Sequence, residues 1–249
     1  MYDNLRRLHA IIDRWLEKYA LDVDYLARAR PGFEAMRERL NDTPGLIICN
    51  RAGGLEPHLT MRILERRQDG LLVANGAGAE LVGRLVGVER VIAVSDDLDD
   101  ARRFVRASIA NMERGGFCLL FPTGKADPDR PQPFKGGFRL LLKRMQPEWM
   151  VYGTHMHPDD AEDFRARMGD FSAERCRQTL ATLEEDLPEP LPPLRQRFDE
   201  RWTTVAQWRE AMGDPRLPEA NERLTRYYAS LFPVERRGKL PVGWPHVWG

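Results

Sequence analysis

What is scarce in this chain excludes several classes of protein. It has three cysteines, Cys49, Cys118 and Cys176, and their spacing fits no metal-ligand pattern. No apolar run approaches the roughly 18 residues of a membrane-spanning helix, and the first residues lack the apolar core of a signal peptide. The 38 basic and 38 acidic residues balance, so no net field attracts nucleic acid. We expect a cytoplasmic or membrane-associated protein with reduced, buried thiols and no nucleic-acid partner.

Short apolar segments alternate with helical patterns between residues 43 and 160. The first of them, Leu46-Ile47-Ile48-Cys49, is apolar at every position, which is typical of a strand buried on both faces of a parallel sheet. Strands at this spacing indicate βαβ units. The sequence therefore predicts an α/β fold, a largely parallel sheet with helices on both faces. The predicted strands are residues 46–49, 71–74, 91–94, 117–121 and 149–153.

The two ends of the chain are predicted to be helical. In the N-terminal segment, 1–42, residues 4–20 and 31–40 form amphipathic helices. The first has two interpretations: it packs on the domain, or it lies in a membrane interface with Trp15 and Tyr19 at headgroup level. Residues 161–249 are expected to form a helical extension packed on the 43–160 core. Its predicted helices are residues 160–168, 172–186, 195–211 and 218–231, with a stiff proline-rich connection at 187–193.

Fixed charges and glycines follow two of the predicted strands. One segment reads Cys-Asn-Arg-Ala-Gly-Gly-Leu-Glu-Pro over residues 49–57, and the other is Leu-Phe-Pro-Thr-Gly-Lys over 120–125, followed by Pro-Phe-Lys-Gly-Gly over 133–137. In an open α/β sheet, loops at the carboxyl ends of parallel strands form the binding crevice. Cations beside glycine loops and helix N-termini suit a phosphate or carboxylate, although solvated surface cations remain an alternative. The expected substrate-binding residues are Asn50, Arg51, Gly53, Gly54, His58, Thr123, Gly124, Lys125, Lys135 and Arg139.

Together these segments resemble the glycerolipid acyltransferase family, the group that acylates lysophosphatidic acid. That family carries N-H-x-S-x-x-D-P after one strand, and F-P-E-G-T-R followed by P-F-K-x-G after a later one. The matching residues are Asn50, Pro57, Phe121, Pro122, Gly124, Phe134, Lys135 and Gly137, and Leu55 falls on an unspecified position of the first motif.

The resemblance covers residues 44–160 and implies an acyltransferase-like fold. It also implies transfer of an acyl group from a thioester to a small polar or phosphorylated acceptor. The donor would be acyl-CoA or acyl carrier protein, acting as co-substrate without a resident cofactor. The family often uses amphipathic N-terminal helices at membranes, which implies peripheral membrane contact through residues 4–20.

The catalytic positions depart from the family's motifs. Arg51 stands in place of the catalytic His, Glu56 in place of the Asp, and Thr123 in place of the Glu of F-P-E-G. A guanidinium has no acceptor and stays protonated, so Arg51 cannot be a general base. His155 and His157 follow the 149–153 strand and should reach the same sheet edge as both motifs. They are the candidate replacement bases with Glu56 as partner, or else turn and capping residues.

Three functions stay open at this point. The first is a divergent acyltransferase with Glu56, His155 and His157 as catalytic residues and no metal. The second is a binding protein that keeps the acyl or phosphate cleft without the base. The third is a metal-assisted hydrolase, because Glu56, His58, His155 and His157 are suitable ligand types, although their spacing matches no common metal pattern.

Overall fold

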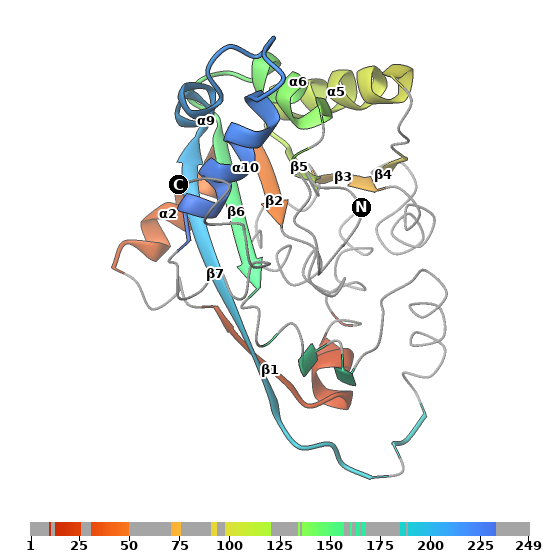
Figure 1. The fold of residues 1–249 in the computed structure, drawn as a ribbon. Coiled ribbons are helices and arrows are strands. Elements are labelled where there is room, and N and C mark those ends of the chain that lie inside the picture. Colours follow the sequence, from red (N-terminus) through yellow and green to blue (C-terminus); the bar gives the residue numbers. More distant parts are fainter. Residues whose placement is uncertain are drawn as a thin grey trace.

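The computed structural model describes part of the chain in detail (Figure 1). The described residues are 10, 13–25, 31–49, 71–75, 91–93, 98–120, 134, 136–156, 160, 163–164, 166–167, 185–187 and 189–232.

The described strands form one mixed, mostly parallel sheet. Its order is β1-β7-β6-β2-β5-β3-β4, and every neighbouring pair is parallel except β6 and β7. The general α/β prediction is confirmed, and the five predicted strands do share one sheet. The strands are β1 (Leu21–Tyr25), β2 (Gly45–Cys49), β3 (Leu71–Asn75), β4 (Val91–Ala93), β5 (Phe117–Leu120), β6 (Met150–Met156) and β7 (Leu194–Thr204).

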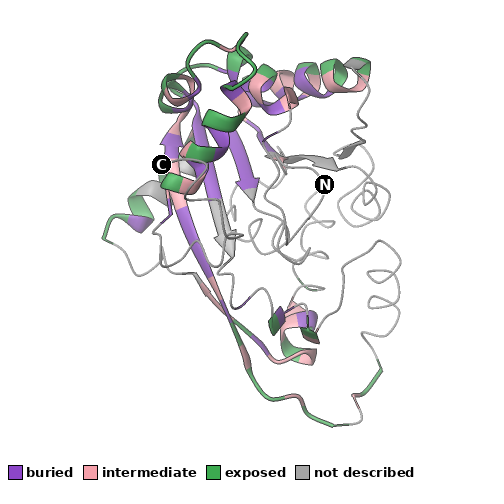
Figure 2. Cartoon of the chain, in the orientation of Figure 1, coloured by how far each residue is buried: buried purple, intermediate pink, exposed green. Residues whose placement is uncertain are grey.

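Helices pack on both faces of the sheet. On one face Leu46, Ile48 and Val151 pack into a core with residues of four helices, α5, α6, α9 and α10. On the other face Trp202 meets Tyr152 and, from α2, the ring of Phe33 at 5.8 Å. Figure 2 shows β2, β5 and the middle of β7 largely buried, and exposed residues along the helices. The helices are α2 (Phe33–Asp42), α5 (Leu98–Glu113), α6 (Gly136–Arg144), α9 (Val205–Met212) and α10 (Ala220–Ser230).

The prediction of a helix over residues 195–211 is wrong for its first ten residues. Residues 195–204 belong to β7, and the helix begins only at Val205, where Thr204 and Gln207 form a capping box. Phe198, Trp202 and Val205 are spaced four and three apart, which imitates a helical stripe. The strand forms because β7 pairs with β1 through residues 194–198 and with β6 through residues 198–204.

The sheet extends beyond the 43–160 segment in both directions. β1 comes from residues 1–42, where only helices were predicted, and β7 comes from residues 161–249. In Figure 1, β1 and the first half of β7 continue past the end of β6 as a two-stranded ribbon. The C-terminal segment is therefore part of the sheet as well as a helical region.

The described part of the first predicted helix supports packing on the domain. Residues 13–18 are helical, and Trp15 is completely buried rather than available to a headgroup layer. Of the later predicted helices, the described residues of 160–168 are helical and Phe164 is buried, whereas 172–184 lie outside the described residues. Among the described residues, no helix combines the length and apolarity needed to cross a membrane.

Candidate functional site

The two motif segments leave neighbouring strands at one edge of the sheet. β2 lies between β5 and β6, and all three run parallel. The chain therefore leaves β2 after Cys49 and β5 after Leu120 on the same side, while β6 continues two residues past Thr154, the partner of Cys49. This carboxyl edge is where an open α/β sheet binds its ligands.

Two of the predicted site residues belong to the described part of the chain, His155 in β6 and Arg139 in α6. The guanidinium of Arg139 donates a 3.3 Å hydrogen bond to the carbonyl of Leu217, in the connection between α9 and α10. The other predicted site residues lie outside the described residues: Asn50, Arg51, Gly53, Gly54, Glu56, His58, Thr123, Gly124, Lys125, Lys135 and His157.

A buried carboxylate stands across from His155. The β6–β7 register pairs His155 with Asp199, and directly opposed residues of an antiparallel pair share a face of the sheet. Asp199 is 3% exposed and accepts hydrogen bonds from the Glu200 backbone N–H at 2.9 Å and from the Arg201 guanidinium at 2.6 Å. Arg201 also donates to the carbonyl of Leu231 at 2.8 Å. The ion pair compensates the buried charge and fixes the carboxylate beside β6.

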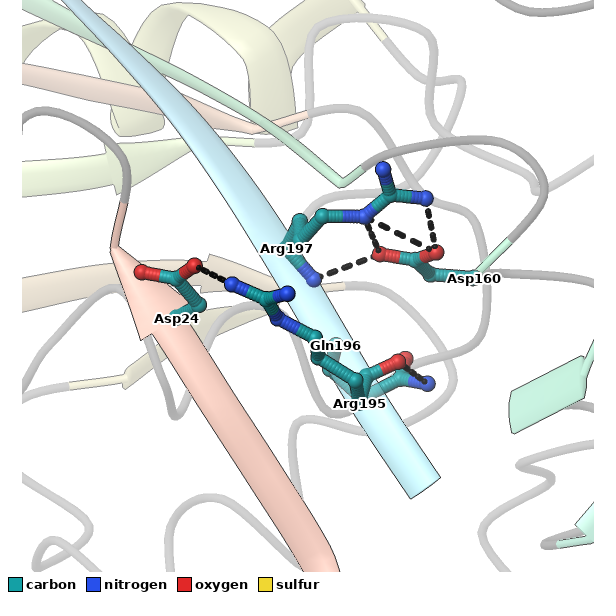
Figure 3. A network of polar contacts seen from close by, with 5 residues as sticks. All are labelled: Asp24, Asp160, Arg195, Gln196 and Arg197. Atoms are coloured by element: carbon teal, nitrogen blue, oxygen red, sulfur yellow. Dashed lines mark hydrogen bonds and ion pairs between the residues drawn. The ribbon is translucent and has the colours of Figure 1, made fainter.

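A second ion pair lies just past the end of β6 (Figure 3). The Asp160 carboxylate accepts from the backbone N–H of Arg197 at 2.6 Å and from its guanidinium Nε and Nη2 at 2.9 and 2.6 Å. Nearby, Arg195 donates to Asp24 of β1 at 2.5 Å. Asp160 is buried, so this bidentate pair ties the segment after β6 to β7.

Sequence reasoning missed Asp160, Arg197, Asp199 and Arg201 because it made residues 195–204 helical. A signal was available. Arginine or aspartate occupies every second position from 195 to 201, and the proline-rich run that precedes them favours an extended chain. Alternation of this kind is typical of a strand.

The described thiol, that of Cys118 in β5, is inert. Burial raises the pKa of Cys118 to about 12, against hydrogen bonds from Ser108 and Asn111 that lower it. Its Sγ lies 3.7 Å from the carbonyl of Ser108. The thiol is therefore protonated at neutral pH, as expected of a buried structural cysteine, and offers no nucleophile.

No family model, curated protein or solved structure matches this chain. The metal set proposed from sequence has three of its four residues outside the described part of the chain, so it stays an untested alternative.

Proposed function

We propose that the protein is a divergent acyltransferase. It would transfer an acyl group from a thioester of coenzyme A or acyl carrier protein to the hydroxyl of a small polar or phosphorylated acceptor. The observation that supports this proposal is the adjacency of β2 and β5, which brings the origins of both motif segments to one edge. β6, with His155, borders β2 on its other side.

In this proposal a histidine at the end of β6 replaces the missing base. It takes the proton of the acceptor hydroxyl while the hydroxyl oxygen attacks the thioester carbon, and it returns the proton to the departing thiolate. An orienting carboxylate was expected from Glu56. The register supplies Asp199 as another candidate, because it stands opposite His155 and is held by Arg201.

The cations of the motif segments bind the anionic parts of the substrates. Arg51, Lys125 and Lys135 follow strands whose ends meet at this edge, or belong to the second motif. An arginine fork holds a phosphate through two parallel hydrogen bonds, and lysine acts as a point charge. Phosphates of coenzyme A, of the carrier's prosthetic group or of a phosphorylated acceptor fit this chemistry.

The test is release of free thiol from octanoyl-CoA in the presence of hydroxyl acceptors such as glycerol 3-phosphate. We expect turnover by the wild type and a loss of about 10²–10⁴ in rate for the His155→Ala, His157→Ala double variant. His9→Ala is the matched control and should keep the wild-type rate. Equal turnover by the wild type and the double variant would show that neither His155 nor His157 acts as the base.

Substitution of Arg51 separates binding from chemistry. Arg51→Ala should mainly raise KM, because a protonated guanidinium can hold an anion but cannot accept a proton. Binding of octanoyl-CoA by the wild type without turnover, over a range of acceptors, would instead favour the non-catalytic binding protein.

A further inference from the structure

Phe134 of the second motif is held by residues far along the chain. Its backbone N–H donates a 2.9 Å hydrogen bond to the hydroxyl of Thr225 in α10, and both residues are buried. Thr225 in turn donates to the carbonyl of Asn221, one turn earlier, at 2.8 Å. The Thr225 hydroxyl therefore donates its hydrogen to the Asn221 carbonyl, and its oxygen accepts from the Phe134 N–H.

The ring of Phe134 is fixed as firmly as its backbone. It packs edge-on against Phe138 at 5.1 Å, lies nearly parallel to Trp208 of α9 at 6.3 Å, and meets Tyr228 of α10 at 5.6 Å. Trp208 donates its indole N–H to Thr203 of β7 at 2.7 Å. This aromatic group therefore connects the second motif to the sheet through α9 and α10.

Lys135, a candidate anion-binding residue, directly follows Phe134 and directly precedes the first residue of α6. Any shift of the Phe134 backbone is transmitted to the residue that follows it. A displacement of about 1 Å can cost up to about a hundredfold in an oriented site.

We infer that Thr225 is a positioning residue of this site. Its hydroxyl fixes the Phe134 N–H and so sets the backbone that presents Lys135 to the phosphates of an acyl thioester. This inference rests on the proposed function, since Lys135 acts on that ligand only there. It makes α10, the last of the described helices, part of the support of the site, although α10 contributes no residue to either motif.

The test compares Thr225→Val with Thr225→Ser. Valine has the shape of threonine but leaves the buried N–H of Phe134 without its acceptor, whereas serine keeps the hydroxyl. For octanoyl-CoA we expect Thr225→Val to raise KM roughly tenfold with little change in kcat, and Thr225→Ser to stay near wild type. Phe104→Leu, at a buried position of α5, is the control for general destabilisation and should leave KM unchanged.

The outcomes separate this inference from the proposed function. If the wild type turns over octanoyl-CoA and Thr225→Val keeps its KM, or if Phe104→Leu raises KM equally, the positioning role is overturned and the acyltransferase remains. If the wild type binds octanoyl-CoA without turnover, the dissociation constant replaces KM. If Thr225→Val then binds octanoyl-CoA roughly tenfold more weakly than the wild type, and Thr225→Ser binds it as the wild type does, the positioning role is supported and the acyltransferase is not. Absence of octanoyl-CoA binding by the wild type overturns both.

Discussion

Gly45 begins β2 at a point with no space for a side chain. A Cβ there would lie 2.3 Å from the backbone carbonyl oxygen of Met150 in β6 and 3.3 Å from a ring carbon of Phe117. The carbonyl cannot retreat without disturbing the β2–β6 pairing. Gly45→Ala should therefore lower the free energy of unfolding by about 1–3 kcal/mol, measured by urea denaturation.

Gly137 provides the matched control for this substitution. It lies in the first turn of α6, and among the described residues no heavy atom beyond its chain neighbours and the helix backbone is within 4 Å of a Cβ built there. Gly137→Ala should leave the protein as stable as the wild type or stabilise it by about 0.5–1 kcal/mol, because alanine loses less backbone entropy in a helix. Equal stabilities of the two variants would contradict the close approach at Gly45.

Cys118 makes stability depend on pH in the alkaline range. Burial raises the pKa of its thiol from 9.0 to about 12. Between these two values the folded state retains a proton that the unfolded state loses. The contribution of the protonated thiol to the free energy of unfolding is therefore complete below about pH 9 and is lost as the pH rises towards 12.

Comparison with Cys118→Ala isolates this contribution from other titrating groups. The difference in unfolding free energy between wild type and variant should be constant from pH 7 to 8. Above pH 9 it should fall by about 1.4 kcal/mol per pH unit, as urea denaturation would measure. A difference that stays constant up to pH 11 would contradict the buried, protonated thiol.

At the scale of elements, α9 stabilises the end of α6 through one side chain. Arg209 donates from Nε to the carbonyl of Leu142 at 2.9 Å and from Nη2 to those of Lys143 at 3.1 Å and Met145 at 2.5 Å. These are carbonyls at a helix C-terminus, where a cation is also favoured by the helix dipole.

Removal of this cap should be measurable in thermal unfolding. Arg209→Met keeps much of the apolar stem and should cost about 1–3 kcal/mol in the free energy of unfolding. Arg209→Lys keeps the charge but loses the planar fork of the guanidinium. Its free energy of unfolding should lie between those of the wild type and Arg209→Met. A methionine variant that unfolds at the wild-type temperature would show that the cap contributes nothing.

The elements that sequence predicted best were those with a local signal. α5 carries a helical stripe that includes Phe104 and Met112, and two residues after its end comes Gly115, whose φ of 86° needs a glycine. β2 and β5 are short apolar runs bounded by glycine and proline. β7 was missed because its large apolar residues lie at helical spacing, and only pairing with β1 and β6 makes it a strand.

At the scale of the whole molecule, the missed features are contacts between distant segments. The sequence predicted the five strands of the central sheet and the common edge reached by β2, β5 and β6. It could not predict that Leu21–Tyr25 pairs with Leu194–Phe198, or that Thr225 meets Phe134, because no local pattern encodes such pairings. Asp199 became a candidate only because β7 pairs with β6 and places it opposite His155.

In the proposed function, the two motif segments form one anion-binding site at the carboxyl edge of the sheet. Calorimetric titration of octanoyl-CoA tests this most directly, with wild type, Arg51→Ala, Lys135→Ala and the control Arg144→Ala. We expect one ligand per chain, and we expect Arg51→Ala and Lys135→Ala each to weaken binding about tenfold, or about 1.4 kcal/mol. Arg144→Ala should have little effect, because this exposed side chain lies at the opposite end of α6 from Lys135. Binding that depends on only one of Arg51 and Lys135, or no binding by the wild type, would contradict the claim.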